Sequence, residues 1–597
     1  MKRFFGYIIA TIIGISLFFV GLFLFFMVVG AAMSGKEEVS ISPNSILYAD
    51  FKTPIKEQGT KNPLADLDLP IPLGGSASTM GLNNIVDAFE KAKTDDNIKG
   101  LYLDLGGISA GWTQIEDIRN AILDFKESGK FVTAYGEVYT QKAYYLASIA
   151  DEVYMHPSGS ILLKGFGGEL TFFKGMLDKL EIEPEIVYVG KYKSATEPFR
   201  FTQMSDENRE QVKTFLTDIY DVILTNLAEA RNLPRETVHD IINELKVRLP
   251  EQAVEHKMID QLSYESAVFD ILREKTGLEE DDKLKFTTLG KYIDAGVKDD
   301  SRSKNKVAVV YAEGSIVDGM GDGENIASER YAKILRKIQR DKKVKAVVLR
   351  VNSGGGSALA SDVIWDEINQ IKEMGIPVYT SMGDVAASGG YYIAANSDKI
   401  YAQENTITGS IGVFGLLADA DKFYENKLGI TFDTVKVTKF SDFPTSPLMT
   451  NNFTAAERNI VQDVIDKIYA DFLIKVGDGR DMDTSAVHEI AQGRVWTGKR
   501  AKTLGLVDEL GSLDAAIADI TGVAGIADDY RLSEYPKQKD PFEEFLTQLQ
   551  GGGGDEEVAR RMLRKKLGHH FAYLEEIEKL IEMHPYQMRM PFYINMD

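Results

Sequence analysis

The chain has 597 residues, which is too long for one hydrophobic core, and its 44% hydrophobic and 26% charged residues are ordinary for a globular protein. Its formal net charge of −22 disfavours nucleic acid as a partner and electrostatic attachment to anionic lipid. Because there is no cysteine, disulfides, thiolate metal sites and a cysteine nucleophile are excluded, and any covalent nucleophile must be an oxygen.

The N-terminus begins with a long apolar segment. Lys2 and Arg3 precede an uncharged run from Phe4 to Met33, and about 20 apolar residues span a bilayer. A cleaved signal peptide is the alternative, but its apolar region is usually only about 7 to 15 residues long. We therefore expect residues 1–35 to form a single-pass transmembrane anchor. The positive charges favour a cytoplasmic N-terminus, which places the body on the extracytoplasmic, periplasmic side of the inner (cytoplasmic) membrane.

Strands and helices alternate through a first region, residues 45–275. The pattern predicts strands over Ile46–Phe51, Gly100–Leu105 and Phe131–Tyr135, with helices over Leu82–Lys93 and Thr113–Glu127. Strands that alternate with helices of about 12 residues imply parallel βαβ units, and hence an α/β fold.

A second region, residues 306–525, repeats this pattern. It predicts strands over Val307–Ala312, Ala346–Val351 and Val378–Met382, with helices over Arg330–Arg340 and Ala360–Lys372. The segment YGEVYTQKAYYLASIADEVY of the first region returns as MGDVAASGGYYIAANSDKIY, so that Tyr144 corresponds to Tyr391 and Asp151 to Asp398. The chain therefore contains a duplicated domain.

Two segments lie outside the repeats. Residues 276–305 are charged and lack sustained periodicity, so we expect a linker there. Residues 526–597 form a C-terminal tail that contains GGGG, RRMLRKK and LEEIEKLIEM and that we expect to be partly helical. The tail is either an element that binds a partner or a second copy, or a solvated appendage.

The two copies differ at two positions that matter for catalysis. Ser388 of the second copy faces Gln141 of the first, whereas Lys193 of the first copy faces Ser441 of the second. Ser388 follows a strand at a glycine-rich turn that opens a helix, where backbone N–H groups favour developing negative charge. A helix-capping serine is the structural alternative. The loss of this serine in the other copy favours a nucleophile.

A serine nucleophile needs a base. The chain has 7 histidines, none in a motif-like setting, and His488 is the one in the core of the second copy, so a Ser-His-Asp triad has little support. A lysine serves if burial lowers its pKa. Lys193 lies in the small, largely uncharged context VGKYKSATEPF, and its register with Ser441 favours it over the neighbouring Lys191. An ordinary surface lysine is the alternative interpretation.

The glycine-rich segment VNSGGGSALAS follows the neighbouring strand and opens a helix, which makes Gly355 a candidate oxyanion donor. Neither GxxxxGK[ST] nor GxGxxG occurs there, so nucleotide binding is disfavoured. The acidic segment Asp318–Asn325 lacks EF-hand spacing. We therefore expect no metal and no cofactor.

Together, AASGGYY, RVNSGGGS, TGSIGVFG and YKSATEPF resemble the signal peptide peptidase A family in its long, duplicated form, which comprises membrane-bound Ser/Lys proteases. The resemblance covers most of the two regions and implies two tandem ClpP/crotonase-like βαβ repeats. It implies that Ser388 is the nucleophile, Lys193 the general base and Ser410 the residue that orients the lysine. The N–H groups of Gly355 and Gly389 would form the oxyanion hole.

The same resemblance implies a homotetramer with internal active sites, which degrades cleaved signal peptides and other apolar peptides. One departure concerns the family's S-P-G-G motif, because Gly354 replaces its proline; we expect a looser oxyanion loop. Two other function classes stay open, a non-enzymatic membrane scaffold and a crotonase-like acyl-CoA enzyme. An extracytoplasmic location argues against the latter, because CoA is cytoplasmic.

Overall fold

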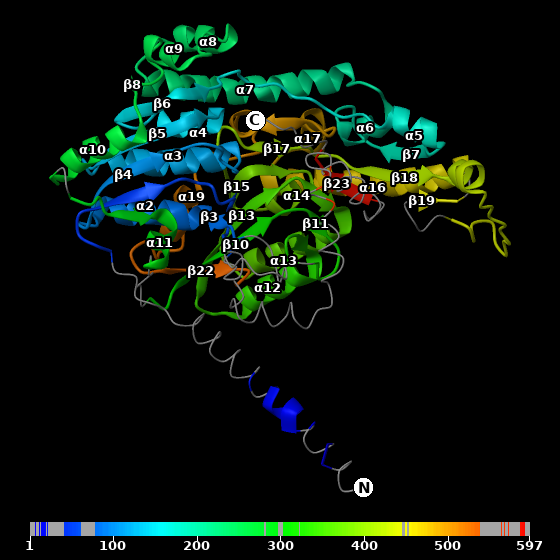
Figure 1. Ribbon diagram of the computed structural model, residues 1–597. Helices are drawn as coiled ribbons and strands as arrows, with labels where there is room; N and C mark the ends of the chain where they lie inside the picture. The colour runs from blue at the N-terminus through cyan, green and yellow to red at the C-terminus, as the bar shows by residue number, and fades with distance from the viewer. Residues whose placement is uncertain are drawn as a thin grey trace.

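We analysed a computed structural model of the chain (Figure 1). It describes residues 41–60, 78–279, 282–296, 303–321, 323–443, 448–450, 453–537 and 586–590, with isolated helical residues between 6 and 21 and at 563, 566 and 571. Most of the expected anchor, residues 1–35, and most of the expected tail lie outside the described residues. Of the helices in the part that is described, none has the length and apolar character needed to cross a bilayer.

A six-stranded parallel sheet forms the centre of the first repeat. Its strands, in the order β8-β6-β5-β4-β1-β9, are Gln261–Leu262, Glu152–Ile161, Phe131–Tyr139, Ile98–Asp104, Ser45–Ala49 and Phe286–Thr288. Along β1, Ile46 packs on one face and Leu47 on the other, and both are fully buried. Apolar residues on both faces are what a parallel sheet between two helical layers requires.

Helices cover both faces of this sheet. The helices of the first repeat are α2 (Leu82–Thr94), α3 (Trp112–Lys126), α4 (Gln141–Ala147), α5 (Lys174–Leu180), η1 (Ser194–Thr196), α6 (Glu197–Arg200), α7 (Asp206–Ala230), α8 (Arg235–Asn243), α9 (Pro250–Glu255), α10 (Glu265–Thr276) and α11 (Leu289–Asp294). Val268 and Leu272 of α10 pack against one face, and α2 and α3 belong to the core on the other. Strand β9 and α11 fall within the segment expected to be a linker, and β9 pairs with β1.

The second repeat has the same architecture. Its sheet has the order β20-β17-β15-β13-β10-β22, with β16 beside β15 and β21 beside β16. These strands are β10 (Lys306–Glu313), β13 (Val344–Ser353), β15 (Val378–Ala387), β16 (Lys399–Ala402), β17 (Ile407–Gly409), β20 (Val495–Thr497), β21 (Glu509–Leu510) and β22 (Arg531–Tyr535). Its helices are α12 (Ser328–Arg340), α13 (Ala358–Glu373), α14 (Gly389–Ala394), α15 (Asp421–Phe423), η2 (Tyr424–Leu428), α16 (Ala455–Arg480), α17 (Thr484–Ile490), α18 (Gly498–Thr503) and α19 (Leu513–Val523).

The duplication extends to individual hydrogen bonds. The Tyr144 hydroxyl donates to the Met258 carbonyl at 2.5 Å, and the corresponding Tyr391 hydroxyl donates to the Leu506 carbonyl at 2.8 Å. The order β21-β16-β15-β13-β10-β22 also matches the order of the first sheet strand for strand. The predicted internal repeat and the mixed α/β fold are therefore confirmed.

A third sheet joins distant parts of the chain. Its strands are β12 (Ile326–Ala327), β11 (Ile316–Val317), β14 (Gly355–Ser357), β23 (Tyr586–Arg589), β18 (Phe414–Asp419) and β19 (Leu448–Met449), with β7 (Glu183–Tyr188) beside β18; β2 (Ile55–Lys56) and β3 (Met80–Gly81) form a separate pair. In Figure 1 the cyan β7 of the first repeat lies along the yellow β18 of the second, and the two strands pair antiparallel over their whole length. The first repeat thus sends one strand into the second.

A buried ion pair connects the repeats elsewhere. Arg350 of β13 is fully buried, and its guanidinium donates to Glu57 at 2.7 Å and to Asp117 at 3.3 Å, both from the first repeat. Asp384 of the second repeat accepts two hydrogen bonds from Thr113 of the first, from its backbone N–H and its hydroxyl. The interface is therefore held by polar contacts with fixed partners.

We expect Arg350→Met to lower the free energy of unfolding by about 3–5 kcal/mol, because Glu57 and Asp117 would stay buried without their cation. Denaturant unfolding followed by circular dichroism measures this. Arg235→Met is the matched control, since the Arg235–Asp221 pair is about half exposed on both sides and its loss costs about 1 kcal/mol or less. If both variants lost the same free energy of unfolding, the buried ion pair of Arg350 would not stabilise the contact between the repeats.

Candidate active site

Ser388 lies between the end of β15 and the start of α14, as predicted from the sequence. Strand β15 is longer than expected and continues to Ala387, because its last residues pair with β17. Ser388 has φ 55° and ψ −115°, a conformation that side-chain-bearing residues rarely adopt. Its N–H donates to the Gly409 carbonyl at 2.8 Å, which helps to hold this turn. Strain of this kind is concentrated at functional sites.

Lys193 reaches Ser388 because of the strand exchange. It follows β7 after a turn at Gly190, whose φ is +97°. If residue 493 had a side chain, its Cβ would lie only 2.6 Å from the Cα of Lys193. A Cβ on residue 412 would lie 3.3 Å from the Cδ of the same lysine. Two glycines of the second repeat thus leave the space that the lysine occupies, and Lys193 is 1% exposed.

The amine of Lys193 has three polar neighbours. Nζ lies 2.9 Å from Ser388 Oγ, 3.0 Å from Ser410 Oγ and 3.1 Å from the Ser410 carbonyl oxygen. A neutral amine has two N–H donors and one lone pair. Ser410 supplies two acceptors, so the lone pair is left to face the Ser388 hydroxyl. Ser410 has φ 49° and is fully buried, which fixes both of its oxygens.

The environment of Lys193 favours the neutral amine. Burial lowers the pKa of Lys193 well below that of an exposed lysine, and burial is the whole cause of the shift. Within the described part of the chain, no carboxylate forms an ion pair with it. The site therefore contains an amine whose pKa is lowered by burial, in contact with a serine hydroxyl.

Two glycines lie close to the serine. Gly389 follows Ser388 directly, and Gly355 opens β14 with φ +94°. A Cβ at Gly355 would lie 2.6 Å from the Gly389 nitrogen, so the two backbones are in close contact. Backbone N–H groups beside a serine hydroxyl can stabilise an oxyanion in acyl transfer, and of these two glycines Gly355 donates its N–H to the Ser353 hydroxyl in this structure.

Sequence reasoning missed two residues that support this site. The Ser353 hydroxyl accepts a hydrogen bond from the Gly355 N–H at 3.1 Å and so holds the loop where Gly354 replaces a proline. The Gln211 amide of α7 donates to the Ser194 hydroxyl at 2.8 Å and to the Tyr192 carbonyl at 3.2 Å, on both sides of the lysine. Ser353 lies in the quoted motif, but Gln211 carries no local signal.

The competing candidates lie elsewhere. Lys191 is exposed, with Nζ 5.2 Å from the centre of the Tyr192 ring. Ser441, the counterpart of Lys193, lies in an exposed loop, and Gln141, the counterpart of Ser388, accepts hydrogen bonds from the backbone N–H groups of residues 164 and 165. His488 is 2.9 Å from the Tyr469 hydroxyl, as His239 is from Tyr220 in the first repeat. Both histidines are thus repeated structural contacts.

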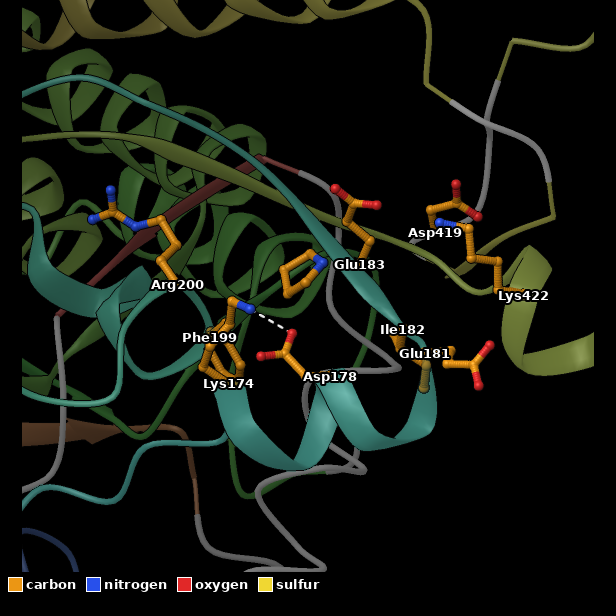
Figure 2. A pocket seen from close by; sticks show the side chains of 10 residues that line it. Lys174, Asp178, Glu181, Ile182, Glu183, Phe199, Arg200, Asp419 and Lys422 are labelled. Carbon is orange, nitrogen blue, oxygen red and sulfur yellow. Dashed lines mark hydrogen bonds and ion pairs between the residues drawn. The ribbon is translucent and has the colours of Figure 1, made fainter. Parts of the chain in front are cut away.

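A surface pocket of about 500 Å³ lies apart from these residues. The pocket lies between two sets of elements, with α5 and β7 on one side and the end of β18 on the other. Acidic and basic side chains line it, among them the Lys174–Asp178 ion pair shown in Figure 2. Neither Ser388 nor Lys193 lines this pocket, so it is separate from the candidate site.

Comparison with known proteins gives a match in each repeat. Residues 124–279 and 370–526 match the model described as Peptidase family S49. The chain is 38% identical to Protease 4 of Haemophilus influenzae over 451 residues, which cover 73% of this chain and 71% of that protein. It is 39% identical over 224 residues to a putative signal peptide peptidase SppA of Enterococcus faecium, covering 37% of this chain and 64% of that protein. A solved ClpP1 mutant of Listeria monocytogenes aligns with 16% identity and a TM-score of 0.24, covering 35% of this chain and 94% of that one.

Proposed function

This chain belongs to peptidase family S49 and is a serine protease, and we propose that it cleaves peptides with Ser388 as nucleophile and Lys193 as general base. The 2.9 Å contact between Lys193 Nζ and Ser388 Oγ carries the proposal. A buried amine without a carboxylate partner is the form of lysine that accepts a proton near neutral pH. The base comes from the first repeat and the nucleophile from the second.

The reaction proceeds through an acyl-enzyme. Lys193 accepts the hydroxyl proton while Ser388 Oγ attacks the peptide carbonyl carbon, and Ser410 holds the amine in position through its two acceptors. The Gly389 N–H stabilises the negative charge that develops on the carbonyl oxygen, and the Gly355 N–H joins it by giving up its hydrogen bond to the Ser353 hydroxyl. Lys193 then passes its proton to the leaving amine, and water hydrolyses the acyl-serine with the lysine again acting as base.

The substrates are apolar peptides, cleaved signal peptides in particular, and residues 1–35 anchor the enzyme in the inner membrane. The name of the Enterococcus faecium relative and the apolar N-terminal run of this chain support this assignment. The full chain is expected to sediment with membranes after an alkaline wash and to be digested by added protease from the periplasmic side alone. Recovery in the washed supernatant would contradict the anchor.

A serine-directed fluorophosphonate tests the proposed nucleophile. The full chain should acquire one adduct, which peptide mass spectrometry locates at Ser388, and it should hydrolyse a fluorogenic apolar peptide until the adduct forms. Modification at another serine, or hydrolysis that continues after complete labelling of Ser388, would contradict the proposal. Membership of a peptidase family leaves the scaffold and acyl-CoA alternatives without a supporting observation.

We also propose that the enzyme assembles as a homotetramer. Residues 429–443, which follow η2, project from the molecule beside β18 in Figure 1 and include exposed apolar side chains. Val435 is 89% exposed, Val437 is 93% exposed, and Ile430 and Phe432 are almost half exposed. Clustered apolar side chains in water indicate a partner surface, and a second copy of the chain satisfies it.

Replacing Val435 and Val437 together by aspartate is expected to reduce the assembly to single chains, because charges would enter an apolar contact. Light scattering coupled to size exclusion in detergent measures the mass. Val523→Asp is the control, since Val523 is 64% exposed on α19, away from this segment. An unchanged mass in the double variant would exclude the segment from the interface.

A further inference from the structure

Gln211 of α7 is a buried amide whose nitrogen and oxygen bind different repeats. Its side chain is 1% exposed. Nε2 donates to the Ser194 hydroxyl at 2.8 Å and to the Tyr192 carbonyl at 3.2 Å, and Oε1 accepts a hydrogen bond of 3.3 Å from the Val495 N–H. Lys193 therefore lies between two residues that one amide holds, and the same amide binds β20 of the second repeat.

A buried chain of hydrogen bonds fixes the direction in which this amide points. The Glu197 carboxylate is buried and accepts a hydrogen bond of 2.8 Å from Asn208 Nδ2. The Asn208 oxygen accepts one of 3.2 Å from Gln211 Nε2. An ionised carboxylate only accepts hydrogen bonds, so Asn208 turns its nitrogen toward Glu197 and its oxygen toward Gln211. Gln211 must then direct its nitrogen to the lysine segment and its oxygen to Val495.

The peptide group between Arg494 and Val495 connects this amide to the rest of the site. Its N–H donates to Gln211, and its carbonyl oxygen accepts a hydrogen bond of 2.6 Å from the Ser410 N–H. Ser410 supplies the two acceptors that hold the Lys193 amine. The proposed base in the first repeat and the serine that orients it in the second are thus both connected to Gln211.

The second copy has no such amide. The tyrosine–histidine contact that both repeats share, with His239 in one and His488 in the other, aligns α7 with α16. In this register Ile460 takes the place of Gln211. Ile460 is 38% exposed, so the lysine-bearing copy buries an amide where the other copy exposes an apolar side chain. Burying an amide costs free energy unless its hydrogen bonds are made. An amide that is needed only beside the lysine accounts for this difference.

We infer that Gln211 is a positioning residue, which sets the distance between the Lys193 amine and the Ser388 hydroxyl by tying the lysine segment to Val495. This inference rests on the proposed function, since the distance matters only if Lys193 is the base. Gln211 acts through the residues on both sides of the lysine, not on the reacting atoms. Displacing a catalytic group by about 1 Å lowers a rate by about 100-fold.

Gln211→Met removes the amide and keeps an unbranched side chain of similar length. In the full chain, kcat for a fluorogenic apolar peptide should fall about 10- to 100-fold, and KM should change by less than about twofold, because proton transfer is impaired while the substrate contacts stay. Gln462→Met is the matched control, since the Gln462 amide is exposed on α16 and donates to Asp466 at 2.7 Å. It should keep both constants. An unchanged kcat in Gln211→Met would overturn the inference.

The pH profile separates positioning from a general loss of structure. Water that reaches a loosened amine would return the pKa of Lys193 toward that of an exposed lysine. The rising limb of kcat/KM should therefore move to higher pH in Gln211→Met. An unfolded fraction would instead lower the rate by the same factor at every pH, and a smaller share of the chains would react with a fluorophosphonate at Ser388. That result would give Gln211 a structural role alone and overturn the inference.

Ser194→Ala is a second variant that serves if Gln211→Met does not fold. It removes one partner of the amide and adds no bulk at a buried residue. kcat should fall about 3- to 10-fold, with the rising limb moved in the same direction. Combined with Gln211→Met it should add no further loss, because the bond between the two side chains is already gone. A wild-type kcat in Ser194→Ala, or losses that multiply in the double variant, would overturn the inference.

Failure of the proposed function gives a different result from failure of the positioning role. If Ser388→Ala and Lys193→Met keep the wild-type rate, the proposed function is wrong, and the role of Gln211 falls with it. If both are inactive while Gln211→Met and Ser194→Ala match the wild type in kcat and in pH profile, the Ser388–Lys193 pair stands and the positioning role alone is wrong.

Discussion

Replacing Ser388 by alanine is expected to lower kcat/KM for peptide hydrolysis by about 10⁴- to 10⁶-fold, because it removes the proposed nucleophile, while Ser410, the other hydroxyl beside the buried amine, serves to hold the lysine. The backbone should stay in place, since alanine occupies no more volume and the turn at residue 388 is held by its backbone hydrogen bond to Gly409. Initial rates on a fluorogenic apolar peptide, with thermal unfolding as the check on folding, give the measurement.

Ser441→Ala is the matched control for this variant. Ser441 is the aligned counterpart of Lys193, but it lies in an exposed loop where its hydroxyl donates to the Thr438 carbonyl at 2.7 Å. The control should keep the wild-type rate. A Ser388→Ala enzyme that keeps more than about one-hundredth of the activity would remove Ser388 from the role of nucleophile.

Lys193→Met should lower the rate by about 10³- to 10⁴-fold, because the methionine fills the same space but accepts no proton. In the wild type, kcat/KM should rise with pH as the Lys193 ammonium loses its proton, and then level off. Burial depresses the pKa of this lysine, so the rise should be complete well below pH 10.4, the region where an exposed lysine titrates. A pH series from 5 to 10 measures it.

Lys191→Met serves as the control, since Lys191 is exposed two residues away from the buried lysine. It should keep both the rate and the pH profile. If instead the Lys191 variant loses activity while the Lys193 variant keeps it, the base has been assigned to the wrong lysine. A wild-type profile without a rising limb would show that no lysine deprotonation limits the reaction.

Local patterns predicted most of the regular structure. The strand at Ala346–Val351 and the helix at Ala360–Lys372 correspond to β13 and α13, because apolar periodicity reports burial directly. The strands proved longer at the ends that meet the site. Strand β15 continues past Met382 through Gly383 and Asp384, which lie at an irregularity between Met382, paired with β13, and Val385, paired with β17.

Features that depend on contacts between distant residues could not be predicted. Strand β7 contains a proline and two glutamates, and it becomes a strand because β18 offers it an edge. Strand β23 has four residues, too few for their alternation of apolar and polar side chains to mark a strand within the tail. Arg350 appears as one arginine within an apolar strand, and its two carboxylate partners lie more than 200 residues away in the sequence. Lys193 could be selected as a candidate from the sequence because the alignment of the two copies showed that Ser441 replaces it in the second copy.

The passage of β7 into the second repeat also sets when activity arises during synthesis. A ribosome makes Lys193 long before it makes Ser388, and the lysine's packing partner Gly493 follows later still. The growing chain therefore contains the proposed base before the proposed nucleophile. Later it contains both of them but still lacks Gly493, which packs against the lysine. A protease built in this order stays inert beside other nascent polypeptides until nearly all of its second half has emerged and folded.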